Sequence, residues 1–190
     1  MRTIDVHKMT DSEMLIGRGG GRRDFPKFVE ATFAALEGET VLWDWSGIRV
    51  ATASYFAAAF VPVMKMLVSG GLDKYFVLHG LNINCEDELK FVLESEGLVT
   101  LVADEVKGGR VLSARPLGKL DSVHAETLNR VVRKPGISAK RLYAESISKG
   151  RTKIGMTAWI NRLVSLYRLR LIKRKRVGRQ FTYAVPYVEV

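Results

Sequence analysis

The sequence lacks the features that mark exported, disulfide-bonded or membrane-spanning proteins. Its single cysteine, Cys85, excludes an internal disulfide and a multi-cysteine metal site, which fits a reducing cytoplasm. The N-terminus, MRTIDVHKMTDSE, has no apolar segment that could serve as a secretory signal. The longest apolar stretch, residues 50–68, contains Pro62 and Lys65 and falls short of the ~20 clean residues that a bilayer span needs. We therefore expect a cytoplasmic protein with no membrane contact, in which this stretch is a buried helix.

The sequence also lacks a recognisable catalytic pattern. His7, His79 and His124 lie far apart, and no HxxxH or His/Asp/Ser constellation surrounds them. No paired carboxylates occur in a pattern that would form a cleft. We therefore expect no enzymatic activity, no metal and no cofactor.

Positive charge is plentiful, but it is confined to one end of the chain. The 190 residues carry a formal net charge of +10. Residues 1–120 contain 14 Lys and Arg against 16 Asp and Glu, a net charge of −2. Residues 121–190 contain 16 against 4, a net charge of +12. This excess indicates a polyanionic partner that binds the C-terminal part.

The first part of the chain alternates apolar strands with amphipathic helices. The segment TVLWDWS, residues 40–46, is apolar on both faces, as expected of a central strand covered on both sides. Strands separated by helices predict an α/β domain at residues 1–104, with a mostly parallel or mixed sheet. The other expected elements are helices at 24–37, 53–69 and 85–95 and strands at 74–81 and 99–103.

Residues 105–121 lose this periodicity. The sequence EVKGGRVLSARPLGKL contains three glycines, a proline and scattered basic residues, a composition that favours an inter-domain linker. We place the domain boundary near residue 115 and expect the second domain at residues 122–190.

The second domain is expected to contain three helices followed by a β-hairpin. Pro135-Gly136 ends the first helix, and Ser138 is a good N-cap for the second. Two β runs meet at Val177-Gly178 and predict a hairpin with a basic tip. The helices are expected at residues 122–133, from 138 onward and at 153–168, with a turn at 148–151.

The end of this domain carries a family pattern. The stretch LVSLYRLRLIKRKRVGRQFTY, residues 163–183, resembles the way bacterial winged helix-turn-helix regulators end their third helix and continue into a basic hairpin. One departure is Arg170, where many members have a helix-ending glycine. The resemblance covers about residues 122–187 and implies a small α+β domain that binds duplex DNA.

The candidate DNA-binding residues fall into three groups. Asn161 and Arg162 on the third helix are side-chain types that pair with adenine and guanine edges. Basic residues at the preceding turn and on the hairpin are expected to contact phosphates. The full set is Lys149, Arg151, Lys153, Thr157, Asn161, Arg162, Ser165, Arg168, Lys173, Arg174, Lys175, Arg176 and Arg179.

Two alternatives stand beside DNA binding. In the first, the basic residues form only a solvated surface. In the second, the domain contacts RNA or protein, as in an interaction protein of the anti-sigma or defence-system type. If the domain binds specific DNA sequences, a homodimer is expected, because one recognition helix contacts few base pairs and a dimer binds two half-sites.

The segment WDWSGIRVATASYFAAAF, residues 43–60, resembles the STAS family, named for sulfate transporters and anti-sigma factor antagonists. Asp44, Ser46, Gly47, Ile48 and Ser54 match the family pattern. Thr52, Ala53 and Tyr55 depart from it, and Ala53 stands where antagonists have the serine that is phosphorylated. The resemblance covers about residues 14–104 and implies an interaction module for dimerisation, a protein partner or a small ligand.

A glycine-rich segment, IGRGGGRR at residues 16–23, is the best site candidate in the first domain. Successive glycines ahead of a helix can expose N–H groups to an anion. The segment lacks the Lys-Ser/Thr pair of a P-loop and the spacing of a dinucleotide fingerprint, so a plain strand-to-helix loop is the alternative. The possible anion-binding residues are Arg18, Gly19, Gly20, Gly21, Arg22 and Arg23.

Overall fold

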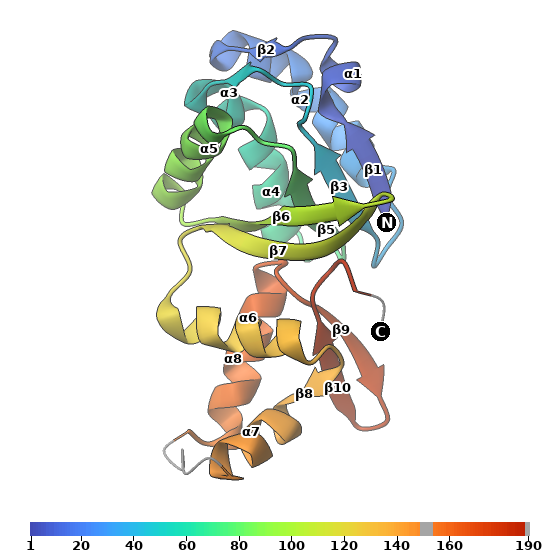
Figure 1. Ribbon diagram of the computed structural model, residues 1–190, viewed down its shortest axis with the longest axis vertical. Coiled ribbons are helices and arrows are strands. Elements are labelled where there is room, and N and C mark those ends of the chain that lie inside the picture. The colour runs from blue at the N-terminus through green and yellow to red at the C-terminus, as the bar shows by residue number, and fades with distance from the viewer. Residues whose placement is uncertain (149–153, 189–190) are drawn as a thin grey trace. The chain divides into compact units, whose positions relative to one another are not determined.

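The computed structural model describes residues 1–148 and 154–188, and the chain divides into two compact units (Figure 1). Unit 1 is Met1–Lys119 and unit 2 is Leu120–Val190. Within the described ranges, no helix combines the length and the apolar character that crossing a bilayer requires.

Unit 1 is built on a five-stranded mixed sheet, as its alternating pattern predicts. The strand order is β1-β3-β5-β6-β7, in which the first four strands are parallel and β7 is antiparallel to β6. A separate two-stranded parallel pair joins β2 to β4. The elements are β1 (Arg2–Asp5), α1 (Val6–Thr10), β2 (Met14–Leu15), α2 (Gly17–Phe33), β3 (Thr40–Asp44), β4 (Val50–Ala51), α3 (Ala53–Ala58), α4 (Phe60–Ser69), β5 (Tyr75–His79), α5 (Ile83–Ser95), β6 (Val99–Lys107) and β7 (Arg110–Gly118).

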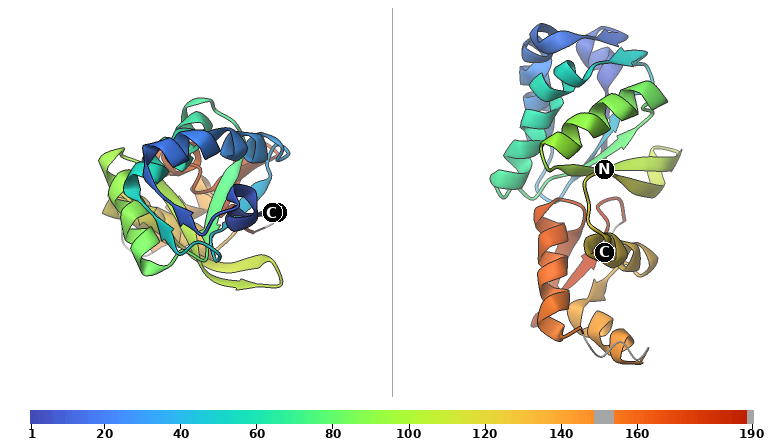
Figure 2. Two further views of the ribbon diagram at one scale, coloured as in Figure 1. Left: turned by 90° about the horizontal axis from the view of Figure 1, so that it is seen from above. Right: turned by 90° about the vertical axis from the view of Figure 1, so that its left-hand side faces the viewer.

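The helices α2, α4 and α5 cover one face of this sheet (Figures 1 and 2). The four parallel strands follow one another in space in chain order, and right-handed crossovers in a constant direction put every connecting helix on the same side. Trp43 of β3 packs there against Phe28 of α2 and Phe60 of α4, with ring centroids 5.2 and 5.7 Å apart. Leu42, next to Trp43 on β3, and its partner Val77 on β5 point to the opposite face and are also buried, as expected of strands that are apolar on both faces.

The apolar stretch at 53–69 forms two helices where one was expected. Pro62 has no N–H to donate to the carbonyl of Ala58. The helix is interrupted at Ala59, between α3 and α4, where φ is −107° and ψ is −61°. Phe56 and Phe60 on either side of the break are fully buried, so the interruption keeps both helices on the core.

The prediction of a linker over residues 105–121 is wrong for most of that length. Residues 105–118 belong to the β6-β7 hairpin, and the boundary between the units follows Lys119. Gly108 and Gly109 form the hairpin turn, with φ of +55° and +72°. Pro116 is accommodated because β7 is an edge strand, where a missing N–H breaks no central ladder.

In its described residues, 120–148 and 154–188, unit 2 has three helices and a small antiparallel sheet with the strand order β8-β10-β9. Its first helix has the bounds that the sequence predicts, and Ser138 accepts a hydrogen bond from the Arg141 N–H at 3.3 Å, as expected of an N-cap. The elements are α6 (Ser122–Arg133), β8 (Ile137–Ser138), α7 (Ala139–Ser148), α8 (Met156–Arg168), β9 (Lys173–Val177) and β10 (Gln180–Ala184). Buried residues at its core are Leu128, Val131, Leu142, Trp159, Leu163, Leu166, Ile172 and Tyr183.

Arg170 ends α8 in the conformation that glycine usually supplies. Its φ is +62°, its N–H donates to the Tyr167 carbonyl at 3.0 Å, and the Leu171 N–H donates to the Leu166 carbonyl at 3.1 Å. These paired bonds are the Schellman arrangement. The guanidinium lies 5.3 Å from the centre of the Tyr167 ring, so contacts of the side chain offset the cost of the left-handed backbone.

Candidate nucleic-acid interface

Most of the basic residues of unit 2, 11 of 16, lie in a segment with no acidic residue. Residues 146–188 contain no Asp or Glu and 11 Lys and Arg. The described acidic residues of the unit belong to α6, its N-cap or α7. They form ion pairs with basic side chains: Asp121 with His124, Glu126 with Arg130, and Glu145 with Lys134 and Arg141. Positive charge is therefore concentrated on α8 and on the β9-β10 hairpin.

The outward face of α8 carries some of the residues that the sequence predicts to contact DNA. Trp159, Leu163 and Leu166 are fully buried and fix the orientation of the helix. Thr157 and Asn161 follow each other by one turn on the opposite, exposed side. Farther along, Ser165 is half-buried and Arg168 is exposed at the last turn. Asn161 is thus exposed to solvent on this face.

Arg162 does not share this face with Asn161. Consecutive residues of an α-helix are about 100° apart around its axis, which turns Arg162 toward the buried stripe. Its guanidinium lies 4.9 Å from the centre of the Trp159 ring, and the Arg130 guanidinium of α6 lies 5.0 Å from the same ring. Cation–π contacts therefore hold Arg162 against the core, and the two expected base readers point in different directions.

Arg174 of the hairpin is held between two aromatic rings. Its guanidinium lies 4.2 Å from the centre of the Tyr167 ring on α8 and 4.5 Å from that of Phe181 on β10. The rings restrict an otherwise flexible side chain, so less entropy is lost when the guanidinium meets an anion. Neither aromatic residue was among the expected site residues.

The tip of the hairpin presents further basic residues. Gly178 turns the chain with φ +60°, and its carbonyl accepts a hydrogen bond from Arg176 Nε at 3.3 Å. Lys175, Arg176 and Arg179 are exposed, while Lys173 is half-buried at the base of the hairpin. Lys149, Arg151 and Lys153, the other expected phosphate contacts, lie outside the described residues.

The glycine-rich segment of unit 1 is helical, and its prediction as a loop is wrong. Helix α2 begins at Gly17 and contains Arg18, Gly19, Gly20, Gly21, Arg22 and Arg23. A Cβ on Gly21 would lie 2.7 Å from the Ala58 Cβ and 2.7 Å from the Tyr55 carbonyl oxygen. Glycine is needed here because α2 and α3 pack backbone to backbone. The segment therefore serves helix packing, and its amides beyond the first turn are used inside the helix.

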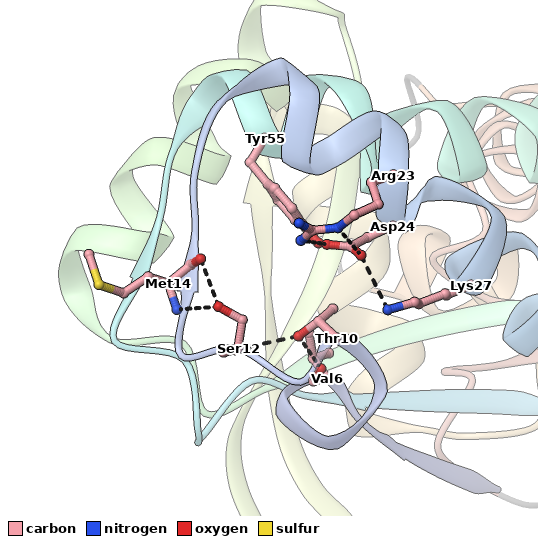
Figure 3. Close-up of polar contacts among 8 residues, drawn as sticks. All are labelled: Val6, Thr10, Ser12, Met14, Arg23, Asp24, Lys27 and Tyr55. Carbon is pink, nitrogen blue, oxygen red and sulfur yellow. Dashed lines mark hydrogen bonds and ion pairs between the residues drawn. The ribbon is translucent and has the colours of Figure 1, made fainter.

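The last arginine of that segment belongs to a buried polar cluster around Asp24 (Figure 3). Arg23 donates two hydrogen bonds to the Asp24 carboxylate, at 3.2 and 3.0 Å, and Tyr55 Oη donates a third at 3.1 Å. The Lys27 ammonium lies 3.3 Å away. Burial alone would raise the pKa of Asp24, but hydrogen bonds from Arg23, Tyr55 and Lys27 outweigh it and hold that pKa below its ordinary value.

This cluster makes the stability of unit 1 sensitive to acid. Because the folded pKa of Asp24 lies below its unfolded value of about 3.8, the carboxylate stabilises the fold above that pH, and the contribution is lost as the pH falls through the folded pKa. We expect Asp24→Asn to lower the free energy of unfolding by about 1–2 kcal/mol at pH 7. Urea denaturation at pH 7 and pH 3 tests this. If the difference in free energy of unfolding between the variant and the unmodified chain does not become smaller at pH 3, the charged role of Asp24 is contradicted.

The segment that follows β3, in which the sequence resembles the STAS pattern, forms a tight turn. Asp44 Oδ1 accepts hydrogen bonds from the Ser46 N–H at 3.0 Å and the Ser46 hydroxyl at 2.6 Å. Farther on, Thr52 caps α3, and the Ala53 N–H donates to Glu88 Oε2 at 2.6 Å. A carboxylate of the chain itself thus binds the first backbone N–H of α3.

No protein-family model, curated protein or solved structure matches this chain. In the described residues no three His, Cys, Asp or Glu side chains are grouped so that they could hold a metal ion. The candidate interface offers an exposed amide on α8 and a group of cations on the adjoining hairpin.

Proposed function

We propose that unit 2 is a winged helix-turn-helix domain that binds duplex DNA, with α8 in the major groove and the β9-β10 hairpin against a flanking backbone. The observation that carries the proposal is the acid-free segment 146–188, in which α8 exposes Asn161 and the hairpin exposes Arg176 and Arg179. The amide suits a base edge, and the guanidinium groups suit phosphates.

The start of α8 supports the same proposal. Gly155 is the N-cap, and because it has no side chain it cannot itself cap the first-turn amides. The N-terminus of a helix favours an anion, since its N–H groups and its dipole both point positive charge outward. A phosphate at this end would fix the register of α8 on the duplex.

We further propose that the whole chain acts as a transcriptional regulator, in which unit 1 is a STAS-like interaction module. Its charge is close to neutral, its core is closed by helices on one face of the sheet, and its glycine-rich segment is used for packing. These properties suit contact with a protein partner, including a second copy of the chain. Two copies would present two α8 helices to a pair of half-sites.

A salt series of duplex binding tests the proposal. Fluorescence anisotropy with a labelled duplex should give a log Kd that rises steeply with log [salt]. About five phosphate contacts, from Arg168, Arg174, Lys175, Arg176 and Arg179, would give a slope of about 4–5.

A labelled single-stranded RNA of equal length is the control ligand. Duplex binding that is weak at low salt, or that is exceeded by the RNA, would contradict the proposal and favour an RNA- or protein-binding role.

A further inference from the structure

We infer that α8 reads A·T base pairs, so that the preferred duplex has A·T-rich half-sites; this inference rests on the proposed function. It is drawn from the composition of the outward stripe of α8, defined as Thr157, Ile160, Asn161 and Val164. These residues are spaced i, i+3, i+4 and i+7 and therefore form one continuous surface.

The stripe is exposed although half of it is aliphatic. Thr157 and Asn161 are exposed, Ile160 has 43% of its surface exposed, and Val164 is half-buried. Ile160 gains little by facing water, whereas on a duplex its methyl groups would be covered. An exposed aliphatic residue beside an amide thus fits a groove that offers both methyl groups and hydrogen-bonding edges.

The side chains of the stripe match the A·T pattern of the major groove. An asparagine amide pairs with adenine through N6 and N7, and aliphatic groups contact the C5-methyl of thymine. Thr157, Ile160 and Val164 each carry methyl groups, and Asn161 supplies the amide. One face of α8 therefore holds both kinds of group that recognise an A·T pair.

The side chains that read G·C pairs are missing from the stripe. Guanine is read chiefly by Arg or Lys, and cytosine by Asp or Glu. Between Met156 and Tyr167 the only charged residue is Arg162, and its guanidinium is held on the Trp159 ring. Arg168 follows only at the last turn of α8, whereas recognition helices contact bases mainly with their N-terminal residues.

Selection from a duplex pool with a randomised centre identifies the preferred sequence without knowledge of the natural site. We expect the full chain to enrich A·T-rich centres. In the selected duplex, replacing thymine by uracil removes only the C5-methyl group, and replacing adenine by 7-deazaadenine removes only the N7 acceptor. Each replacement should weaken binding about tenfold.

The Asn161→Ala variant should lose about tenfold of the preference for the selected duplex over a G·C-rich one. Its salt slope should stay unchanged, because Asn161 carries no charge. Asn129→Ala is the matched control, since Asn129 is an exposed asparagine on α6, and it should behave like the unmodified chain. Equal thermal unfolding of both variants excludes misfolding as the cause.

Steep salt dependence of duplex binding combined with G·C-rich enrichment, or with no sequence preference, would overturn this inference and leave the proposed function standing. Insensitivity to both base analogues would also overturn it. An absence of salt-sensitive duplex binding would overturn the proposed function and this inference together.

Discussion

Arg176→Gln/Arg179→Gln should weaken duplex binding about 20-fold near physiological salt and reduce the slope of log Kd against log [salt] by about two. Each arginine at the hairpin tip is exposed, and each phosphate contact that it makes releases about one counterion. Glutamine keeps a similar length and polarity while removing the charge. Anisotropy titrations of the double variant across a salt series measure both quantities.

Arg133→Gln/Lys140→Gln is the matched control for the hairpin variant. Both residues are exposed in unit 2, on α6 and α7, and the substitution changes the net charge by the same amount. If the hairpin contacts the backbone, the control should lose only a few-fold in affinity and keep its salt slope. Equal losses in the two double variants would mean that the net charge of the unit attracts DNA without a defined role for the hairpin.

Gly21→Ala should lower the free energy of unfolding of unit 1 by about 2 kcal/mol, because the new Cβ would overlap Ala58 and the backbone of Tyr55. Gly19→Ala should raise it by about 0.5–1 kcal/mol, because Gly19 is a helical residue with open space around its Cβ position. The two substitutions are chemically identical, lie two positions apart, and have expected effects of opposite sign.

Urea denaturation followed by tryptophan fluorescence measures this difference. A Trp159→Phe background leaves Trp43 and Trp45 as the only tryptophans, so the signal reports unit 1. Stabilisation by both substitutions would show that the glycine segment does not press α2 against α3.

Sequence periodicity predicted the helices of unit 2 better than the edges of unit 1. The α6 helix has an aspartate N-cap before it and Pro135-Gly136 after it, so both ends carry a local signal. Strand β1 is only RTID, too short and too polar to stand out from a loop. Strand β7 contains Pro116, which argues against a strand, and the hairpin signal of Gly108-Gly109 was read as part of a linker.

The prediction of a loop at the glycine-rich segment was wrong for a related reason. Three successive glycines are poor helix formers, and only the close approach of α3 explains why this helix has a glycine at position 21. This contact joins residues more than 30 positions apart. Pro62 was visible in the sequence, and its missing N–H is the local cause of the break before α4.

The candidate interface was predictable as a set of charges but not as a set of orientations. The helical spacing predicts that Asn161 lies on the exposed side of α8, and it is exposed. The position of Arg162 depends on Trp159 and on Arg130 of α6, and that of Arg174 depends on Phe181 across the hairpin. Such contacts are set by tertiary packing, although an arginine three residues after a tryptophan in a helix is a usable signal.

The acid-free segment also gives dissolved salt two opposing effects on unit 2. Arg170 and Arg174 both lie against the Tyr167 ring, so two like charges share one aromatic surface in the free protein. Ions screen this repulsion and stabilise the free unit, while the same ions compete with its attraction for a polyanion. If unit 2 binds DNA as proposed, the salt concentration at which the free unit is most resistant to heat is therefore also the one at which it binds DNA least tightly, and at low salt the phosphates of bound DNA would take over the screening of these two charges.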